Sequence, residues 1–134
     1  MTFDDDDLSI RITEAGDHIL VTVAGDLDLE SAPAMTAALR KVLGDQPIVV
    51  DLSGVDFMDS SGLGVLVGAH KEAAALLLAE PGPRLQKIFK ITKLHKVFAL
   101  YGTVDEAIAS LRPPAGEIEA PVEAVVPGFE EQSP

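Results

Sequence analysis

Residues 48–52, Ile-Val-Val-Asp-Leu, form a short run that is apolar at four of its five positions and shows almost no alternation. Such a run is typical of a β-strand that is covered on both faces, because a half-buried strand alternates apolar and polar side chains. We therefore expect this strand to lie in the centre of a sheet. A covered central strand needs further layers around it, and helices packed on a largely parallel sheet commonly supply them.

Strand and helix patterns alternate along the rest of the chain. Two alternating stretches, joined by turn residues at 14–17, predict a β-hairpin before the first helix. The later strands each follow a helix, which favours an α/β fold: one domain with a mixed, mostly parallel sheet of four to five strands and about four helices. The expected order is β-β-α-β-α-β-α-β-α, with strands at 8–13, 19–24, 48–52, 76–79 and 97–101, and helices at about 31–44, 60–75, 84–91 and 103–112.

The predicted helices carry apolar stripes and end signals. Ser31 can cap the first helix, Pro33 suits its first turn, and Gly44 can end it. Thr103 and Glu106 fit a capping box, in which a hydroxyl and a carboxylate each satisfy a free backbone N–H. The residues expected to face inward are Met35, Ala38, Leu39 and Val42 in the first helix, Leu63, Leu66, Val67 and Ala74 in the second, and Leu85, Ile88 and Phe89 in the third.

A length of 134 residues suits one domain, which we place at 8–112. Residues 1–7 hold four Asp, and residues 113–134 hold five Glu without Lys or Arg, so we expect both ends to be disordered acidic segments. The chain has no Cys, no secretion signal and no apolar run that could span a bilayer. We therefore expect a cytoplasmic monomer that does not bind membranes.

The formal net charge of −12 argues against nucleic acid as a partner, because phosphate contacts require a dense cationic face. One basic pattern is present, since Arg84, Lys87, Lys90, Lys93 and Lys96 recur every three residues. These side chains form either a solvent-facing stripe that balances the acidic first half of the chain or a contact surface for an acidic partner.

A polar and glycine-rich run opens the second predicted helix: Asp59-Ser60-Ser61-Gly62-Leu63-Gly64. Its first three residues can each cap a helix, because their side-chain oxygens accept from unpaired N–H groups of the first turn. The glycines that follow each cost a helix roughly 1 kcal/mol relative to Ala. Such a cost indicates the close approach of another body. Either Gly64 and Gly68 let the helix sit close to its own sheet, or an external partner docks there.

No enzymatic motif fits this run. A dinucleotide fingerprint would need a third glycine where Val67 stands, and it would need a tight turn after the strand, where seven residues, 53–59, precede the predicted helix. Phosphate-binding P-loop, nucleophile-elbow and Ser-x-x-Lys motifs are absent from the sequence. The contiguous carboxylates at 4–7 lack the spacing of a calcium loop. We therefore predict no catalytic residue, no cofactor, no metal site and no enzymatic activity.

Five blocks follow one another along the chain: Gly25-Asp-Leu-Asp28, the strand at 48–52, Val55-Asp-Phe-Met-Asp-Ser-Ser-Gly-Leu-Gly-Val65, Arg84-Leu-Gln-Lys-Ile-Phe-Lys-Ile91, and Lys96-Val-Phe98 to Thr103-Val-Asp-Glu-Ala-Ile108. In this order and near this spacing they resemble the anti-sigma factor antagonists of the STAS domain family, over about residues 8–111. The run from Asp59 to Gly64 is the most specific part. The connection at 71–76 is shorter than the family commonly has, so the helix must end early or the strand must start late.

The resemblance implies that Ser60 is phosphorylated by an anti-sigma factor that is itself a serine kinase. The unphosphorylated chain would bind this kinase and release a sigma factor, and a PP2C-type phosphatase would reset the switch. ATP and magnesium would belong to the kinase, and the Ser60 hydroxyl would have to face solvent. The residues implied to contact the partner are Asp28, Asp59, Ser60, Ser61, Gly62, Leu63 and Gly64.

Two alternatives remain open at this point. The domain could be a scaffold or transport-associated STAS module in which Ser60 is never modified. It could also bind a nucleotide at the start of the second helix, although no phosphate-gripping Lys lies near residues 60–64.

Overall fold

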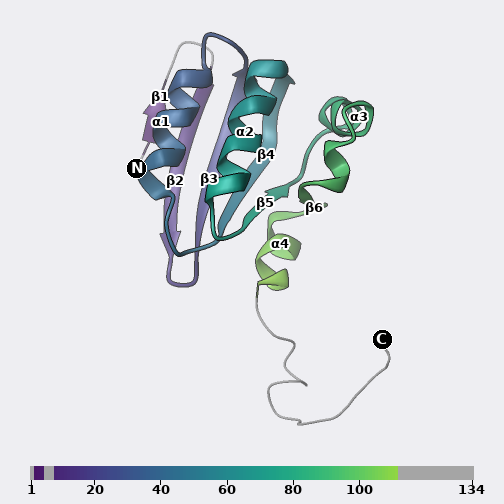
Figure 1. Cartoon of the computed structure of the whole chain (residues 1–134). Coiled ribbons are helices and arrows are strands. Elements are labelled where there is room, and N and C mark those ends of the chain that lie inside the picture. The colour runs from purple at the N-terminus through teal and green to yellow at the C-terminus, as the bar shows by residue number, and fades with distance from the viewer. Residues whose placement is uncertain (1, 5–7, 112–134) are drawn as a thin grey trace, which may run out of the picture.

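Strand β4 (Ile48–Met58) lies between β3 and β5 in a mixed six-stranded sheet of order β1-β2-β3-β4-β5-β6. The computed structural model describes residues 2–4 and 8–111 (Figure 1). The first three strands are antiparallel, and β3 to β6 run parallel. The predicted α/β fold and its order of strands and helices from residue 8 onward are confirmed, and β1 adds a sixth strand to the four to five that were predicted. The other strands are β1 (Thr2–Asp4), β2 (Leu8–Ala15), β3 (His18–Leu27), β5 (Leu76–Ala79) and β6 (Ala99–Tyr101).

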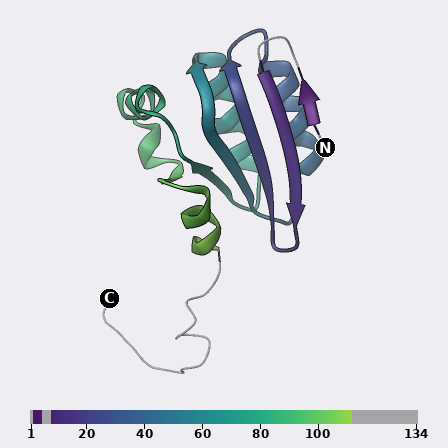
Figure 2. The same ribbon diagram turned by 180° about the vertical axis from the view of Figure 1, so that it is seen from behind.

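The helices are α1 (Ala32–Val42), α2 (Ser60–Glu72), α3 (Pro83–Ile91) and α4 (Val104–Ser110), with a short 3₁₀ turn, η1 (Leu94–Lys96). Helices α1 and α2 lie side by side on one face of the sheet, and α3 lies on the far side of α2 from α1 (Figures 1 and 2). Helix α4 packs on the opposite face against the first half of β4 and against β5. None of the helices in residues 2–4 and 8–111 is long and apolar enough to cross a membrane.

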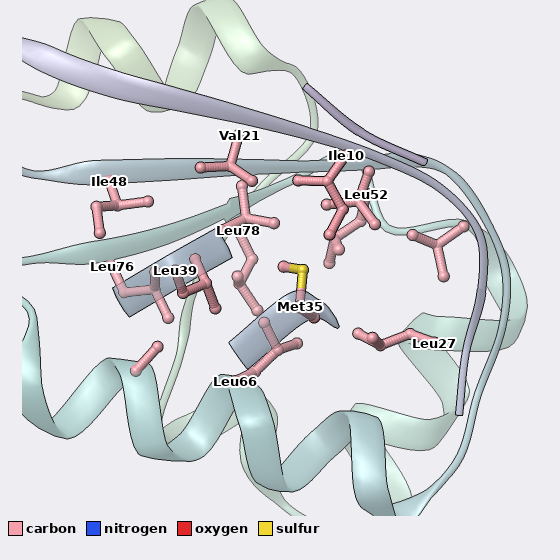
Figure 3. Close-up of a cluster of buried hydrophobic side chains, with 14 of the residues drawn as sticks. Ile10, Val21, Leu27, Met35, Leu39, Ile48, Leu52, Leu66, Leu76 and Leu78 are labelled. Atoms are coloured by element: carbon pink, nitrogen blue, oxygen red, sulfur yellow. The ribbon is translucent and has the colours of Figure 1, made fainter. Parts of the chain in front are cut away.

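The main core lies between the sheet and helices α1 and α2 (Figure 3). Side chains from β2 to β5 point into this layer and meet Leu66 of α2. The four residues predicted to face inward from the first helix, Met35, Ala38, Leu39 and Val42, are all buried. In α3, Leu85 and Phe89 are buried and Ile88 is partly buried.

A second, smaller cluster explains why residues 48–52 do not alternate. Val49, Leu77 and Ala107 meet on the face that α4 covers, whereas Val50 and Leu78 point to the main core. Both faces of this part of β4 are therefore dry, as the apolar run predicted. The capping box that opens α4 is also confirmed, because the Thr103 hydroxyl accepts from the Glu106 N–H and the Glu106 carboxylate accepts from the Thr103 N–H.

The second half of β4 was not predicted. Residues 53–59 were expected to be a loop, but the strand continues to Met58 and pairs with β3 through two register shifts. Bulges of this kind break the two-residue period, so Val55 and Met58 are buried three positions apart. The spacing argument against a dinucleotide site is therefore wrong, since α2 begins directly after Asp59. The missing third glycine, where Val67 stands, still argues against such a site.

Other boundaries also differ from the predicted ones. Helix α2 ends at Glu72, so the helix ends early and Ala74, expected on its apolar stripe, is exposed in a three-residue connection to β5. The last strand begins at Ala99, because η1 occupies residues 94–96. Residues 2–4 were assigned to a disordered end, whereas their backbone pairs with the open edge of β2. Residues 5–7 and the predicted acidic tail at 113–134 lie outside the described residues.

Leu66 gives a direct test of the main core. We expect Leu66→Ala to lower the free energy of unfolding by about 2–5 kcal/mol, because the side chain is fully buried and its removal leaves a cavity. Ile91→Ala is the control, since Ile91 is 71% exposed and should change stability by no more than about 0.5 kcal/mol. Urea unfolding of both variants measures the difference, and equal losses would contradict this packing.

Candidate functional site

The candidate site lies where β3 and β4 end together. Leu27 and Met58 are the last paired residues of these two parallel strands, so the residues that follow them emerge at the same edge of the sheet. The chain after Leu27 enters the loop that leads to α1, and the chain after Met58 enters α2 directly. The Asp59 N–H donates to the Leu27 carbonyl at 3.2 Å, which joins the two segments.

The Asp59 carboxylate holds both segments in place. Its Oδ1 accepts from the N–H groups of Ser61 at 2.8 Å and Gly62 at 3.1 Å, and so caps α2. Its Oδ2 accepts from the N–H of Leu29 at 3.2 Å, in the loop before α1. Of the three residues that could cap this helix, Asp59 is therefore the one that does. One side chain fixes the start of the helix and the neighbouring loop together.

A second carboxylate, that of Asp28, shapes the loop before α1. Its Oδ1 accepts from the N–H groups of Glu30 at 3.1 Å and Ser31 at 3.0 Å. The Ser31 hydroxyl donates to the Asp26 carbonyl at 2.7 Å and accepts from the Asp28 N–H at 2.9 Å. The expectation that the Ser31 side chain caps α1 is wrong, because this buried hydroxyl is used to close the loop.

The structure brings the residues predicted for the site together at this edge. Ser60 is the first residue of α2 and is exposed, so its hydroxyl is accessible to another protein. Ser61 and Leu63 are partly buried, Gly62 is buried, and Gly64 is exposed. Asp28 and Asp59 are partly buried, and their carboxylates accept hydrogen bonds from backbone N–H groups. The described residues contain no group of three acidic or histidine side chains that could hold a metal ion.

The glycines of α2 have different roles. A Cβ added at Gly62 would lie 2.5 Å from the carbonyl oxygen of Leu27, so the helix crosses the end of β3 in close contact at this residue. At Gly64 and Gly68 nothing lies within 4 Å of an added Cβ. The expectation that Gly64 and Gly68 let the helix approach the sheet is therefore wrong. The alternative of an external partner at these two glycines stays a prediction.

A groove between α1 and α2 was not found from the sequence. It has a volume of about 320 Å³, and its lining includes Ser61, Gly64 and Gly68 from α2 and Thr36 and Arg40 from α1. The groove therefore begins at the residue next to Ser60. The only sequence signal for it was the unexplained pair of glycines at 64 and 68, because a groove between two helices depends on how they pack.

Comparison with known proteins identifies the family. Residues 9–107 match the STAS domain. The chain belongs to the STAS domain family. It is 39% identical over 100 residues to the anti-sigma-B factor antagonist of Listeria monocytogenes. This alignment covers 69% of this chain and 88% of that protein. Anti-sigma factor antagonists of this family are regulators and not enzymes, which confirms the prediction that this chain has no enzymatic activity.

Solved structures share this fold. An anti-sigma factor antagonist from Mycobacterium paratuberculosis superposes with a TM-score of 0.75 at 29% identity, over 82% of this chain and 98% of that one. The antagonist SpoIIAA in its unphosphorylated form gives a TM-score of 0.64 at 25% identity, over 77% of this chain and 96% of that one. SpoIIAA of Bacillus has also been solved in the phosphorylated form, which matches at 22% identity with a TM-score of 0.61, over 77% of this chain and 99% of that one.

The two kinds of glycine in α2 can be separated by mutation. We expect Gly62→Ala to destabilise the chain by about 1–3 kcal/mol, because the new methyl group meets the backbone carbonyl oxygen of Leu27 at 2.5 Å as well as the buried side chains of Leu27 and Met58. Gly64→Ala is the matched control and should stabilise by up to about 1 kcal/mol, since its methyl group meets open space and Ala favours helix. Urea unfolding measures both, and equal effects would contradict the close approach at Gly62.

The Asp59 cap gives a further test. Asp59→Ala removes the acceptor of three backbone N–H groups and should lower the free energy of unfolding by about 0.5–2 kcal/mol. Asp59→Asn should cost less, because Asn is an equally good N-cap and keeps one carbonyl oxygen. Thermal unfolding compares the three proteins. An Asp59→Ala chain as stable as the original would show that the cap contributes nothing.

Proposed function

We propose that this chain is a cytoplasmic anti-sigma factor antagonist that is turned off by phosphorylation of Ser60. The exposed position of Ser60, at the first residue of α2 in a STAS domain, carries this proposal. Unphosphorylated, the chain binds an anti-sigma factor serine kinase and displaces the sigma factor from it. The chain acts as a monomer, and its contact surface is the edge formed by Asp28, Asp59, Ser60, Ser61, Leu63 and Gly64, with the buried Gly62 holding the start of α2 against the end of β3.

The switch is a phosphoryl transfer. The kinase moves the γ-phosphoryl group of its own ATP to the Ser60 oxygen, so an O–P bond forms at Ser60, the bond between the β- and γ-phosphates breaks, and ADP leaves. The hydroxyl proton passes to a base of the kinase. A PP2C-type phosphatase later hydrolyses the phosphoserine with water, which restores the hydroxyl and releases inorganic phosphate. No catalytic group of this chain is needed for either step.

Phosphorylation should leave the fold intact. The added group carries about 1.5–2 negative charges, which the N-terminus of a helix tolerates, with a favourable contribution of roughly 0.3–1 kcal/mol. The gain is at the lower end of that range here, because the Asp59 carboxylate already accepts from the N–H groups of Ser61 and Gly62. The phosphate therefore finds few free donors and lies among carboxylates. Its effect falls on binding, not on folding.

The loss of binding follows from desolvation. A partner that covers Ser60 must remove water from the phosphate while Asp28 and Asp59 stay nearby. A cost of about 2–4 kcal/mol weakens binding about 30- to 900-fold. The magnitude is enough to convert a tight complex into a transient one.

The Ser60 hydroxyl can be tested by substitution. We expect Ser60→Ala to bind the anti-sigma factor as the original chain does and to resist inactivation by ATP, since it has no oxygen to accept the phosphoryl group. Ser60→Glu should lose binding but keep its unfolding free energy within about 1 kcal/mol. Mass spectrometry after incubation with the kinase and ATP locates the phosphate, and titration calorimetry measures binding.

Ser61→Ala is the matched control for this experiment, because Ser61 is the adjacent hydroxyl and is less exposed. It should still be phosphorylated on Ser60. Phosphate on Ser61, or a Ser60→Glu chain that binds as tightly as the original, would refute the assignment. A Ser60→Glu chain that unfolds would show a structural role for the serine.

A further inference from the structure

Leu29 is a conspicuously exposed apolar side chain beside the site. It is 72% exposed, although it lies in the loop between the acidic residues Asp28 and Glu30. The loop backbone is held in place, because the Leu29 N–H donates to the Asp59 carboxylate and the Asp28 carboxylate fixes the turn that follows. The loop therefore cannot rearrange to bury the Leu29 side chain. The leucine is therefore held outward at the edge that also carries Ser60.

A shallow hollow continues from Leu29 along α1. It is lined by Leu29, Ala32, Pro33, Thr36, Ala37 and Arg40. Thr36 and Arg40 also line the groove between α1 and α2, which reaches Ser61 and Gly64. The outer face of α1 thus carries small and apolar side chains next to Leu29, where a solvent-facing helix surface is usually charged. Leu29, this hollow and the Ser60 edge form one continuous surface.

We propose that Leu29 is the apolar anchor by which the anti-sigma factor holds this chain, and that the contact extends from Ser60 over the hollow on α1. This inference rests on the proposed function. The partner then offers an apolar pocket that receives Leu29 beside its kinase active site. Phosphorylation of Ser60 places a strongly hydrated dianion next to a contact that must be dry, which adds to the loss of binding.

Charge argues against two other occupants of this surface. The edge carries Asp26, Asp28, Glu30, Asp56 and Asp59, and these carboxylates outnumber the two basic groups beside them, Arg40 in the hollow and Arg84, whose guanidinium reaches the Asp56 carbonyl at 3.5 Å. The C-terminal segment 113–134 holds five Glu and no basic residue, so this edge repels it. A second copy of the chain would bring the same acidic edge to the contact. Neither argument applies to an anti-sigma factor, because the surface with which it reaches Ser60 is not set by the acidic sequence of this chain.

The test compares two leucine-sized side chains of equal exposure. Leu29→Ser should weaken binding to the anti-sigma factor that phosphorylates this chain by about 5- to 30-fold, the effect expected for an exposed leucine that becomes buried in the complex. Ile91→Ser is the matched control, since Ile91 is 71% exposed on α3, on the far side of α2, and lines neither hollow (Figure 1). It should bind as the original chain does. Leu29→Met keeps apolar volume and should stay within about 3-fold of the original.

Titration calorimetry on unphosphorylated chains measures all three, with circular dichroism to verify that each is folded. Equal binding by Leu29→Ser and Ile91→Ser would overturn the anchor while leaving the Ser60 switch in place. A Leu29→Met chain as weak as Leu29→Ser would also overturn it, because loop shape and not apolar burial would then be responsible. If Leu29→Ser changed only self-association, the surface would belong to a dimer and the inference would fail. Retained binding by Ser60→Glu would instead refute the proposed function.

Discussion

The carboxylate of Asp59 is the interaction on which the site depends. It accepts from three backbone N–H groups, two at the start of α2 and one in the loop before α1. Charge-assisted bonds of this kind are stronger than bonds between neutral groups, so Asp59 ties the start of α2 to the loop before α1. A single residue therefore fixes the backbone on both sides of the site, next to Ser60 and at Leu29. The register of β3 and β4 supplies the rest, because Leu27 and Met58 end as paired neighbours.

Much of the fold could be predicted because its signals are local. The run at 48–52, apolar at four of its five positions, indicated a strand that is covered on both faces, and the clusters on the two sides of the sheet confirm it. The capping box at Thr103 was read from two residues at fixed spacing. The second half of β4 escaped prediction because bulges shift its register and remove the two-residue period on which strand recognition depends.

The site was predicted in part for a similar reason. Its residues were found from the run at 59–64 and its resemblance to a family, but their separate roles depend on tertiary contacts. Gly62 is the glycine that packing requires, because α2 crosses the Leu27 carbonyl at this residue. The sequence alone does not indicate that crossing. Leu29 was missed because a single leucine in a polar loop gives no periodic signal. Its position depends on the bond between its N–H and Asp59, which is distant in sequence, together with the local turn that Asp28 fixes.

The early end of α2 has a consequence for the speed of the proposed switch. The helix follows Asp59 directly from β4 and returns to β5 through only residues 73–75, so both of its ends are tethered to adjacent parallel strands. Three residues span at most about 11 Å, which leaves the helix no slack to slide along its axis. A helix tethered in this way changes the chemistry of its exposed surface and not its position in the fold. In the proposed switch, the time needed to change state would then be set by the encounter with the kinase or phosphatase and by dissociation of the complex, and not by a slow rearrangement of the domain.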